Sequence, residues 1–170
     1  MADIRQSDRM PFRDSAGFRD KNAWATANAD GLTAQKNSFW YLWHSLGSSV
    51  TVEYGSIQGL LSKPHRYEIV LAGAITEHLA DPVTAIGAAA RLAKEMVIVA
   101  FTPVHDSDDE FLKPLVPWDN PAVDYVWWAA SRGLYRRVFD NMGFDIECVP
   151  CTVSYQGEDV PRQTIIARRR

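Results

Sequence analysis

An acidic residue followed by a histidine, Glu77–His78, is the feature of this sequence best suited to chemistry. The pair lies in LAGAITEHLADP (residues 71–82), which overlaps the end of the apolar run YEIVLA (residues 67–72). Histidine exchanges protons near neutral pH, so His78 is a candidate catalytic base, and Glu77 can orient it or contact a bound ligand. The alternative is that both side chains only form hydrogen bonds in a first helical turn. The residue types leave both interpretations open.

Two other groups of residues have types that bind metals or react with oxidants. Cys148 and Cys151 are spaced C-x-x-C, but they lie in FDIECVPCTVSY, which has the pattern of a strand rather than of a helix N-terminus. A zinc site would need further ligands, and neither a second C-x-x-C nor an H-x-x-x-H is present. The acidic run HDSDDE (residues 105–110) lacks the Gly and the distal Glu of a calcium loop. We therefore predict no metal site, two ordinary strand cysteines and a solvated acidic loop.

Two adjacent tryptophans, Trp127 and Trp128, stand in the long segment that precedes the last predicted helix. Paired indoles can stack on a planar substrate. They can equally be lid residues that pack on a sheet. Both interpretations stay open at this point.

Helices and strands must position these residues, and the sequence predicts most of them. The predicted elements are, in chain order, a helix over 37–46, strands over 48–56 and 67–74, a helix over 82–94, a strand over 96–104, a long loop over 105–130, a helix over 133–142 and strands over 144–155 and 162–169. Asp81 followed by Pro82 is typical of a helix start, Ser131 can cap the last helix, and Gly143 can end it. The strand over 67–74 is apolar enough to be buried on both faces, as parallel strands are.

Strands that alternate with helices predict an α/β fold with a Rossmann-like, mostly parallel sheet, here with a C-terminal antiparallel pair. In such sheets, ligands bind outside the carboxyl ends of the strands. This rule selects the lip of a candidate site, which consists of Gly55, Ser56, Ala72, Gly73, Ala74, Thr102 and Pro103.

The composition limits the classes of protein to be considered. The chain has 170 residues, 46% of them hydrophobic, and a formal net charge of −3, so it has no overall basic field for nucleic acid. No apolar run approaches the ~18 residues of a membrane span, and the N-terminus is not a secretory signal. We expect a cytoplasmic protein with no membrane partner, a polar N-terminal arm over residues 1–37, and a C-terminal ARRR that is a solvated tail.

Four stretches resemble the C-terminal half of the class I S-adenosylmethionine-dependent methyltransferases. They are VTVEYGSI (50–57), YEIVLAGAITEHLADPVTAI (67–86), RLAKEMVIVAFTPV (91–104) and SRGLYRRVFDNMGFDIE (131–147). The resemblance implies S-adenosylmethionine as cofactor and a small-molecule or nucleoside methyl acceptor. It implies contacts to the cofactor from the first two of these stretches, which are Gly55, Ser56, Ile57, Ala72, Gly73, Ala74 and Glu77. It also implies acceptor contacts from Thr102, Trp127 and Trp128. The Glu-His pair is common in that family whatever the substrate, so the resemblance favours a structural or cofactor-adjacent role for the pair, and His78 as base rests on the chemistry of its side chain. The small residues at 72–74 also suit close packing of the next helix.

The sequence departs from that family at its most diagnostic element. It has no Gly-rich turn after a first strand and no acid after a second strand, so residues 38–170 resemble a methyltransferase domain that is incomplete relative to the seven-stranded fold. A gap in a sheet invites pairing with a partner, and we predict a homodimer through it. Two hypotheses follow: an S-adenosylmethionine-dependent methyltransferase, or a non-catalytic module of that fold for binding or dimerisation.

Overall fold

The computed structural model describes residues 21–53, 55, 59, 66–79, 81–114, 128–155 and 157–170. The chain forms two compact units, residues 1–56 and residues 57–170, and each is described by itself. Among the described residues, no helix is both long and apolar enough to cross a membrane.

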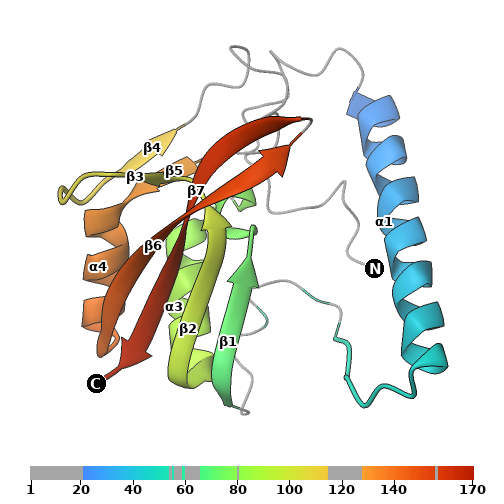
Figure 1. Ribbon diagram of the computed structural model, residues 1–170, viewed down its shortest axis with the longest axis horizontal. Helices are drawn as coiled ribbons and strands as arrows, with labels where there is room; N and C mark the ends of the chain where they lie inside the picture. The colour runs from blue at the N-terminus through green and yellow to red at the C-terminus, as the bar shows by residue number, and fades with distance from the viewer. Residues whose placement is uncertain are drawn as a thin grey trace. The chain divides into compact units, whose positions relative to one another are not determined.

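The first unit contains one long helix, α1 (Lys21–Ser45), drawn in blue in Figure 1. It includes the predicted helix but starts at Lys21, so the predicted boundary at residue 37 falls inside it. The strand predicted over 48–56 is wrong for residues 48–53, which form no strand. The Trp43 indole N–H donates to the Val50 carbonyl at 2.7 Å, which occupies an acceptor that a sheet would need. Alternating apolar residues alone do not supply the neighbouring strand that a ladder requires.

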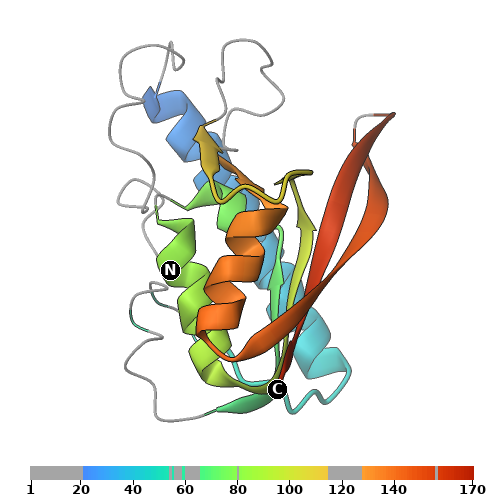
Figure 2. The same ribbon diagram turned by 90° about the vertical axis from the view of Figure 1, so that its left-hand side faces the viewer.

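The second unit is a mixed α/β structure in which two helices cover one face of a sheet (Figures 1 and 2). Its elements are β1 (Tyr67–Gly73), the 3₁₀-helix η3 (Thr76–His78), α3 (Pro82–Leu92), β2 (Ala93–Thr102), β3 (Val104–His105), β4 (Leu112–Pro114), β5 (Trp128–Ser131), α4 (Arg132–Asn141), β6 (Phe144–Tyr155) and β7 (Glu158–Arg169).

The main sheet has the strand order β1-β2-β7-β6. β1 and β2 are parallel, with Leu71 opposite Ile98, whereas β7 runs antiparallel to both of its neighbours, β2 and β6. The sheet is not closed on itself. This arrangement confirms the predicted α/β class with a C-terminal antiparallel pair.

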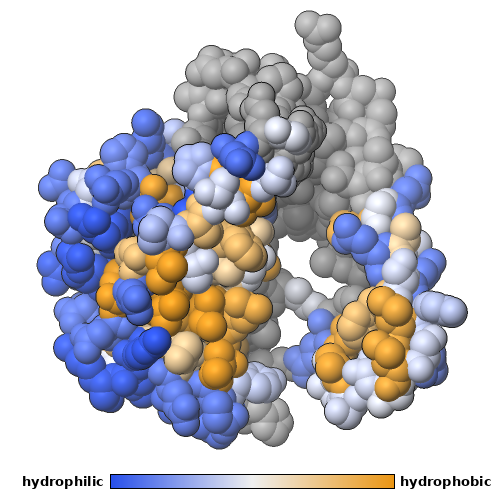
Figure 3. Space-filling model, viewed as in Figure 1, coloured by the Kyte–Doolittle hydropathy of each residue, from blue (hydrophilic) through white to orange (hydrophobic). Residues whose placement is uncertain are grey.

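Among the described residues, β1 lies at an edge of this sheet and is largely exposed, which corrects the prediction of a strand buried on both faces. Ile69 and Leu71 keep 54% and 66% of their surface exposed. On the same face, Met96 and Ile98 of β2 are half-buried. Figure 3 views the sheet from the side away from α3 and α4, and apolar side chains gather there over β1 and β2.

The hydrophobic core lies between the sheet and the two helices. Its buried members are Ile86, Ala89, Ala90, Ala93, Val97, Val99, Ala130, Tyr135, Phe139, Phe144, Ile165 and Ala167. The buried alanines of α3 (Ala85, Ala88, Ala89 and Ala90) let that helix approach the sheet closely. The rings of Phe139 and Phe144 meet edge to face, with centroids 5.9 Å apart, so α4 is locked against the start of β6.

α3 and α4 begin at the residues that the sequence predicts as caps, and α4 ends at the predicted glycine. Asp81 accepts a hydrogen bond from the Thr84 N–H at 2.9 Å, and Pro82 occupies the first turn of α3. Ser131 accepts from the Leu134 N–H at 3.0 Å. Gly143 stops α4 with a φ of +80°, a conformation that costs glycine little. These signals are local, and each is confirmed.

The predicted loop over 105–130 contains a small three-stranded sheet in the order β3-β5-β4. β5 pairs in parallel with β3 and antiparallel with β4. Each of these strands is four residues or shorter, so periodicity has too few positions to reveal them.

The C-terminal basic run is part of the fold, contrary to the predicted solvated tail. The Arg169 guanidinium donates to the carbonyls of Ala90 and Ala93 at 3.0 and 2.8 Å, where the last turn of α3 leaves acceptors unpaired. It also lies 4.2 Å from the centre of the Phe144 ring. Arg169 therefore joins the end of α3 to β7.

Candidate functional site

The candidate site lies at the carboxyl ends of β1 and β2, which are adjacent because the two strands are parallel. Gly73 pairs with Ala100, and the Ala74 N–H donates to the Ala100 carbonyl at 2.9 Å. Ala74 and Phe101 have φ values of +46° and +59°, and among the described residues they are the non-glycine residues with positive φ. Such conformations are strained for residues with a Cβ, and they cluster at functional sites. Both strand ends thus turn sharply at the same edge.

A cluster of three buried hydroxyl groups lies directly beneath this edge. The Thr102 Oγ1 is 3.2 Å from the Tyr135 hydroxyl oxygen, and the Thr76 Oγ1 is 3.4 Å from each of them. All three residues are 2% exposed or less. Burial raises the pKa of Tyr135, so its hydroxyl keeps its proton and can donate it in a hydrogen bond. The cluster connects η3, β2 and α4 around the strand ends.

Glu77 and His78 lie in the 3₁₀ turn that follows β1. Glu77 is 5% exposed, so it is buried rather than presented at the surface. Its Oε2 accepts from the Thr76 hydroxyl at 3.4 Å, and its Oε1 is 3.9 Å from the His78 Nε2. Burial raises the pKa of Glu77, while nearby positive charge on His78 opposes that shift. The interpretation as a hydrogen-bonded pair in a first helical turn therefore fits Glu77, whereas the His78 side chain remains 28% exposed and accessible.

Trp128, at the start of β5, is half-buried beside this turn. Its indole N–H donates to the Leu79 carbonyl at 3.0 Å, immediately after His78. This contact fits a residue that covers and holds the 3₁₀ turn. Thr102 is 1% exposed, and its hydroxyl belongs to the buried cluster.

The structure brings together most of the residues selected from the sequence. Those that share the edge of the second unit are Ala72, Gly73, Ala74, Glu77, His78, Thr102 and Trp128. Gly55 belongs to the first unit. Ser56, Ile57 and Trp127 lie outside the described residues. Thr76 and Tyr135 also belong to the site, and the sequence did not predict them. A Thr beside the Glu-His pair was an available signal, whereas Tyr135 joins the site only through the packing of α4.

Space for a ligand exists along the β1 side of this site. A Cβ built on Gly73 would meet no atom within 4 Å. An apolar groove of about 170 Å³ runs between β1 and α3. Its lining residues are Val70, Leu71, Ala72, Gly73, Ile75, Thr76, Ala85, Ile86, Ala89, Leu92 and Val99. The small residues at the strand end therefore leave open volume next to Ile75 and Thr76, at the start of the turn that carries Glu77.

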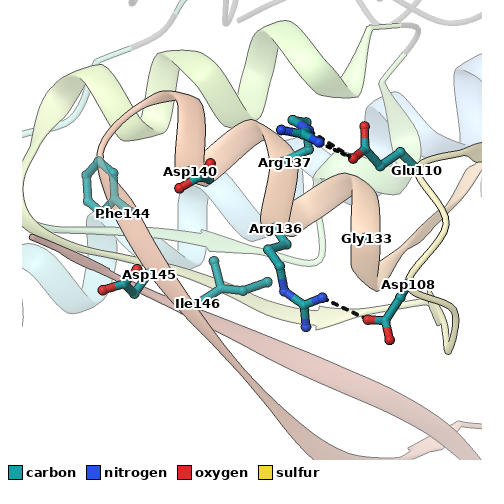
Figure 4. A pocket seen from close by; sticks show the side chains of 9 residues that line it. All are labelled: Asp108, Glu110, Gly133, Arg136, Arg137, Asp140, Phe144, Asp145 and Ile146. Atoms are coloured by element: carbon teal, nitrogen blue, oxygen red, sulfur yellow. Dashed lines mark hydrogen bonds and ion pairs between the residues drawn. The ribbon is translucent and has the colours of Figure 1, made fainter.

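A second groove, of about 440 Å³, lies on the outer side of α4 (Figure 4). Its carboxylates are neutralised, because Arg136 contacts Asp108 at 2.8 Å and Arg137 contacts Glu110 at 2.8 Å. The guanidinium groups of Arg136 and Arg132 lower the pKa of Asp108. The predicted solvated acidic loop is thus tied to α4 by ion pairs. Among the described residues, no group of three metal-binding side chains occurs.

The residues present fit one side of a nucleoside-type cofactor site. Open space at Gly73, with a buried carboxyl and an accessible imidazole nearby, suits a flat ligand at the strand ends. The sequence contains no Gly-rich turn for close backbone approach and no ribose-binding acid after a second strand. The described residues could therefore line this ligand on the β1–β2 side only.

Comparisons with known proteins identify the fold. No family model matches the sequence, and no curated protein matches it. The N-terminal domain of EvdMO1, determined in the presence of S-adenosylhomocysteine and D-fucose, aligns with a TM-score of 0.51 at 16% identity, covering 76% of this chain and 60% of that one. An O-methyltransferase family protein from Burkholderia thailandensis aligns with a TM-score of 0.51 at 14% identity, covering 79% of this chain and 40% of that one.

A third match is magnesium protoporphyrin IX methyltransferase from Synechocystis PCC 6803 with bound S-adenosylmethionine. Its TM-score is 0.43 at 17% identity, and the match covers 65% of this chain and 43% of that one. The chain thus spans less than two thirds of each of these three proteins. The alignments at a TM-score of 0.51 show that it has the fold of the class I S-adenosylmethionine-dependent methyltransferases.

Proposed function

We propose that this chain is an S-adenosylmethionine-dependent methyltransferase that acts on a small-molecule or nucleoside acceptor. One observation carries the proposal: the open strand end at Gly73 lies a few residues from the buried Glu77 and the accessible His78. The fold supports it, because the EvdMO1 domain with S-adenosylhomocysteine shares this arrangement of helices and strands. In such sheets, a cofactor is expected to bind at the carboxyl ends of the parallel strands.

The chain's own residues have separable roles in this proposal. S-adenosylmethionine, when bound, supplies a methyl group on a sulfonium for in-line displacement. His78 accepts the proton that the acceptor loses, since its side chain is accessible at the site edge. Glu77 orients the imidazole from its buried position, with Oε1 3.9 Å from Nε2. Trp128 holds the turn in place through the Leu79 carbonyl.

Calorimetric titration with S-adenosylmethionine and S-adenosylhomocysteine tests the binding step. We expect heat of binding for the unmodified chain and at least a tenfold weaker affinity for Gly73→Val, because the valine side chain would occupy the open space, where an added Cβ meets no atom within 4 Å. Gly87→Ala is the matched control, since its new methyl group also meets nothing and lies on α3. Absence of heat in the unmodified chain at millimolar ligand would contradict the proposal.

Turnover by a His78→Ala variant tests the catalytic step separately. We expect binding of S-adenosylhomocysteine to persist while methyl transfer falls, because the imidazole is assigned to the acceptor and not to the cofactor. Unchanged turnover would remove the assignment of His78 as base and leave a positioning role for the pair.

A second candidate function is a non-catalytic module of the same fold. The observation in its favour is the exposed apolar edge at β1, together with the lack of a Gly-rich turn in the sequence. The same titration separates the two candidates, since the module predicts no affinity for either nucleoside ligand.

A further inference from the structure

The open edge of the main sheet has the properties of an interface. Among the described residues, β1 pairs with β2 and with no other strand. Its outward-facing side chains Ile69 and Leu71 are more than half exposed. Its single charged residue, Glu68, is neutralised by the Lys94 ammonium group at 2.7 Å. The edge therefore exposes apolar side chains and little uncompensated charge.

Edge strands of soluble proteins commonly carry features that prevent pairing with another chain, such as prolines, charges and bulges. β6, at the opposite edge, has them: Asp145 and Glu147 are exposed, and Pro150 lacks an N–H. β1 contains no proline. The irregularity in its pairing with β2 places the extra residue on β2, since two steps from Tyr67 to Ile69 correspond to three from Ala93 to Met96. β1 itself is therefore left suitable for a further strand.

The sequence of β1 is complementary to itself when two copies run antiparallel. Val70 is the midpoint of Tyr67–Gly73, so a two-fold axis there pairs all seven residues of the strand. Ile69 of one copy then lies opposite Leu71 of the other, and apolar pairs of this kind stabilise sheets. Glu68 faces Ala72, so no like charges meet.

The ends of the strand fit the same register. Tyr67 of one copy lies opposite Gly73 of the other, where a Cβ would meet no atom within 4 Å. The large ring thus faces a residue that has no side chain.

We propose that two copies of this chain pair through β1, antiparallel and in the register centred on Val70, to form one continuous sheet. Pairing satisfies the free backbone groups of both edges and buries Ile69 and Leu71 of each copy. It also brings Tyr67 of each copy to the carboxyl end of β1 in the other, at the lip of the candidate site. This interface does not depend on methyl transfer.

Size-exclusion chromatography with light scattering tests the association. We expect a species of twice the chain mass of 19.1 kDa. Leu71→Lys should convert it to a monomer, because the substitution places an ammonium group in the apolar pair with Ile69 while Leu71, at 66% exposure, contributes little to the fold. Val83→Lys is the matched control, since Val83 is exposed on α3 and away from the edge, and it should stay dimeric.

Cysteine cross-linking tests the register, in a chain whose Cys148 and Cys151 are replaced by alanine. Directly opposed residues place their Cβ atoms roughly 4.5–5.5 Å apart, which a small adjustment brings into disulfide range. Val70→Cys should therefore form an intermolecular disulfide under mild oxidation. In the Ile69→Cys variant, and equally in Leu71→Cys, the two introduced cysteines of the dimer are not directly opposite each other. These two variants should therefore form no intermolecular disulfide.

A monomer at all concentrations would overturn the proposal, and it would indicate that a segment of the same chain covers the edge. A dimer that tolerates Leu71→Lys would overturn it as well, since the interface would then lie elsewhere. Cross-linking at residue 69 or 71 in place of 70 would refute the proposed register.

Discussion

The two sides of the second unit differ in how completely they are packed. On the α4 side, Phe139 is fully buried. The arginines of α4 form ion pairs with acidic residues of the segment 105–111. On the β1 side, Leu71 is 66% exposed and a groove runs beside α3. The difference is that the α4 side is closed by contacts among the described residues, whereas the β1 side leaves apolar side chains and a groove exposed among them.

The candidate site lies where these two sides meet. Tyr135 of α4 reaches the hydroxyl cluster from the packed side, and Gly73 ends β1 on the open side. Rigid support on one side and free space on the other is a suitable arrangement for binding, because the fixed groups need no reorganisation when a ligand arrives. The same contrast predicts that substitutions on the two sides will have very different costs.

The largest expected effect is that of truncating the core on the α4 side. Phe139→Ala should lower the free energy of unfolding by about 3–5 kcal/mol, because it removes a fully buried ring and leaves a cavity. Leu71→Ala, on the β1 side, should change the free energy of unfolding of the monomeric unit by less than about 0.5 kcal/mol. Chemical denaturation under dilute, monomeric conditions measures both. Equal losses would show that β1 is packed after all.

The same comparison can be made by adding one methyl group at either of two glycines, Gly133 and Gly87. An added Cβ at Gly133 would collide with the backbone carbonyl of Asp108, so Gly133→Ala should destabilise the fold by about 1–3 kcal/mol as the two backbone segments move apart. Gly87→Ala should stabilise it by about 0.5–1 kcal/mol, since alanine favours the helix and its methyl group meets nothing. Thermal unfolding should shift in opposite directions for the two variants. A shift in the same direction would contradict the described approach of residues 106–109 to α4.

A smaller effect is expected from removing one hydroxyl group of the buried cluster. Tyr135→Phe should cost about 1 kcal/mol in the free energy of unfolding, because Thr76 and Thr102 each lose a buried partner. Adding Thr102→Val should cost less in the Tyr135→Phe background than in the unmodified chain. Additive losses would mean that the hydroxyl groups do not interact.

The smallest effect depends on pH. Burial raises the pKa of Glu77, so the folded chain holds this proton more tightly than the unfolded chain. The stability that this proton contributes is complete below the ordinary carboxyl pKa and is lost as pH rises through the raised value. Glutamine cannot titrate, so Glu77→Gln should gain stability relative to the unmodified chain between pH 4 and pH 7. Parallel melts at both pH values check the sign, and a relative loss would show that attraction to His78 outweighs burial.

Much of the site was predictable from local signals. Asp81, Ser131 and Gly143 mark helix ends because their effects act over a few residues of the same chain. The strand ends at 72–74 and 102 followed from the alternation of strands and helices. Trp128 was selected from its type, but whether it stacks or packs required knowing that its indole reaches Leu79, far away in the sequence.

Other features depend on partners that are distant in sequence. Residues 48–53 alternate like a strand and form none, because a strand needs a neighbour that alternation cannot supply. The sequence predicts a solvated basic C-terminus, but Arg169 donates hydrogen bonds to the carbonyls at the end of α3. The charges of the acidic loop are likewise paired only because arginines of α4 lie beside it.

The sequence by itself determined the fold class, the helix ends and the location of the strand-end site, since these follow from periodicity, turn chemistry and chain order. Only the tertiary structure decided that Glu77 is buried while His78 is accessible, that Tyr135 belongs to the site, and that β1 is an exposed edge. Burial and exposure depend on what packs against a residue, and those contacts join segments far apart in the chain.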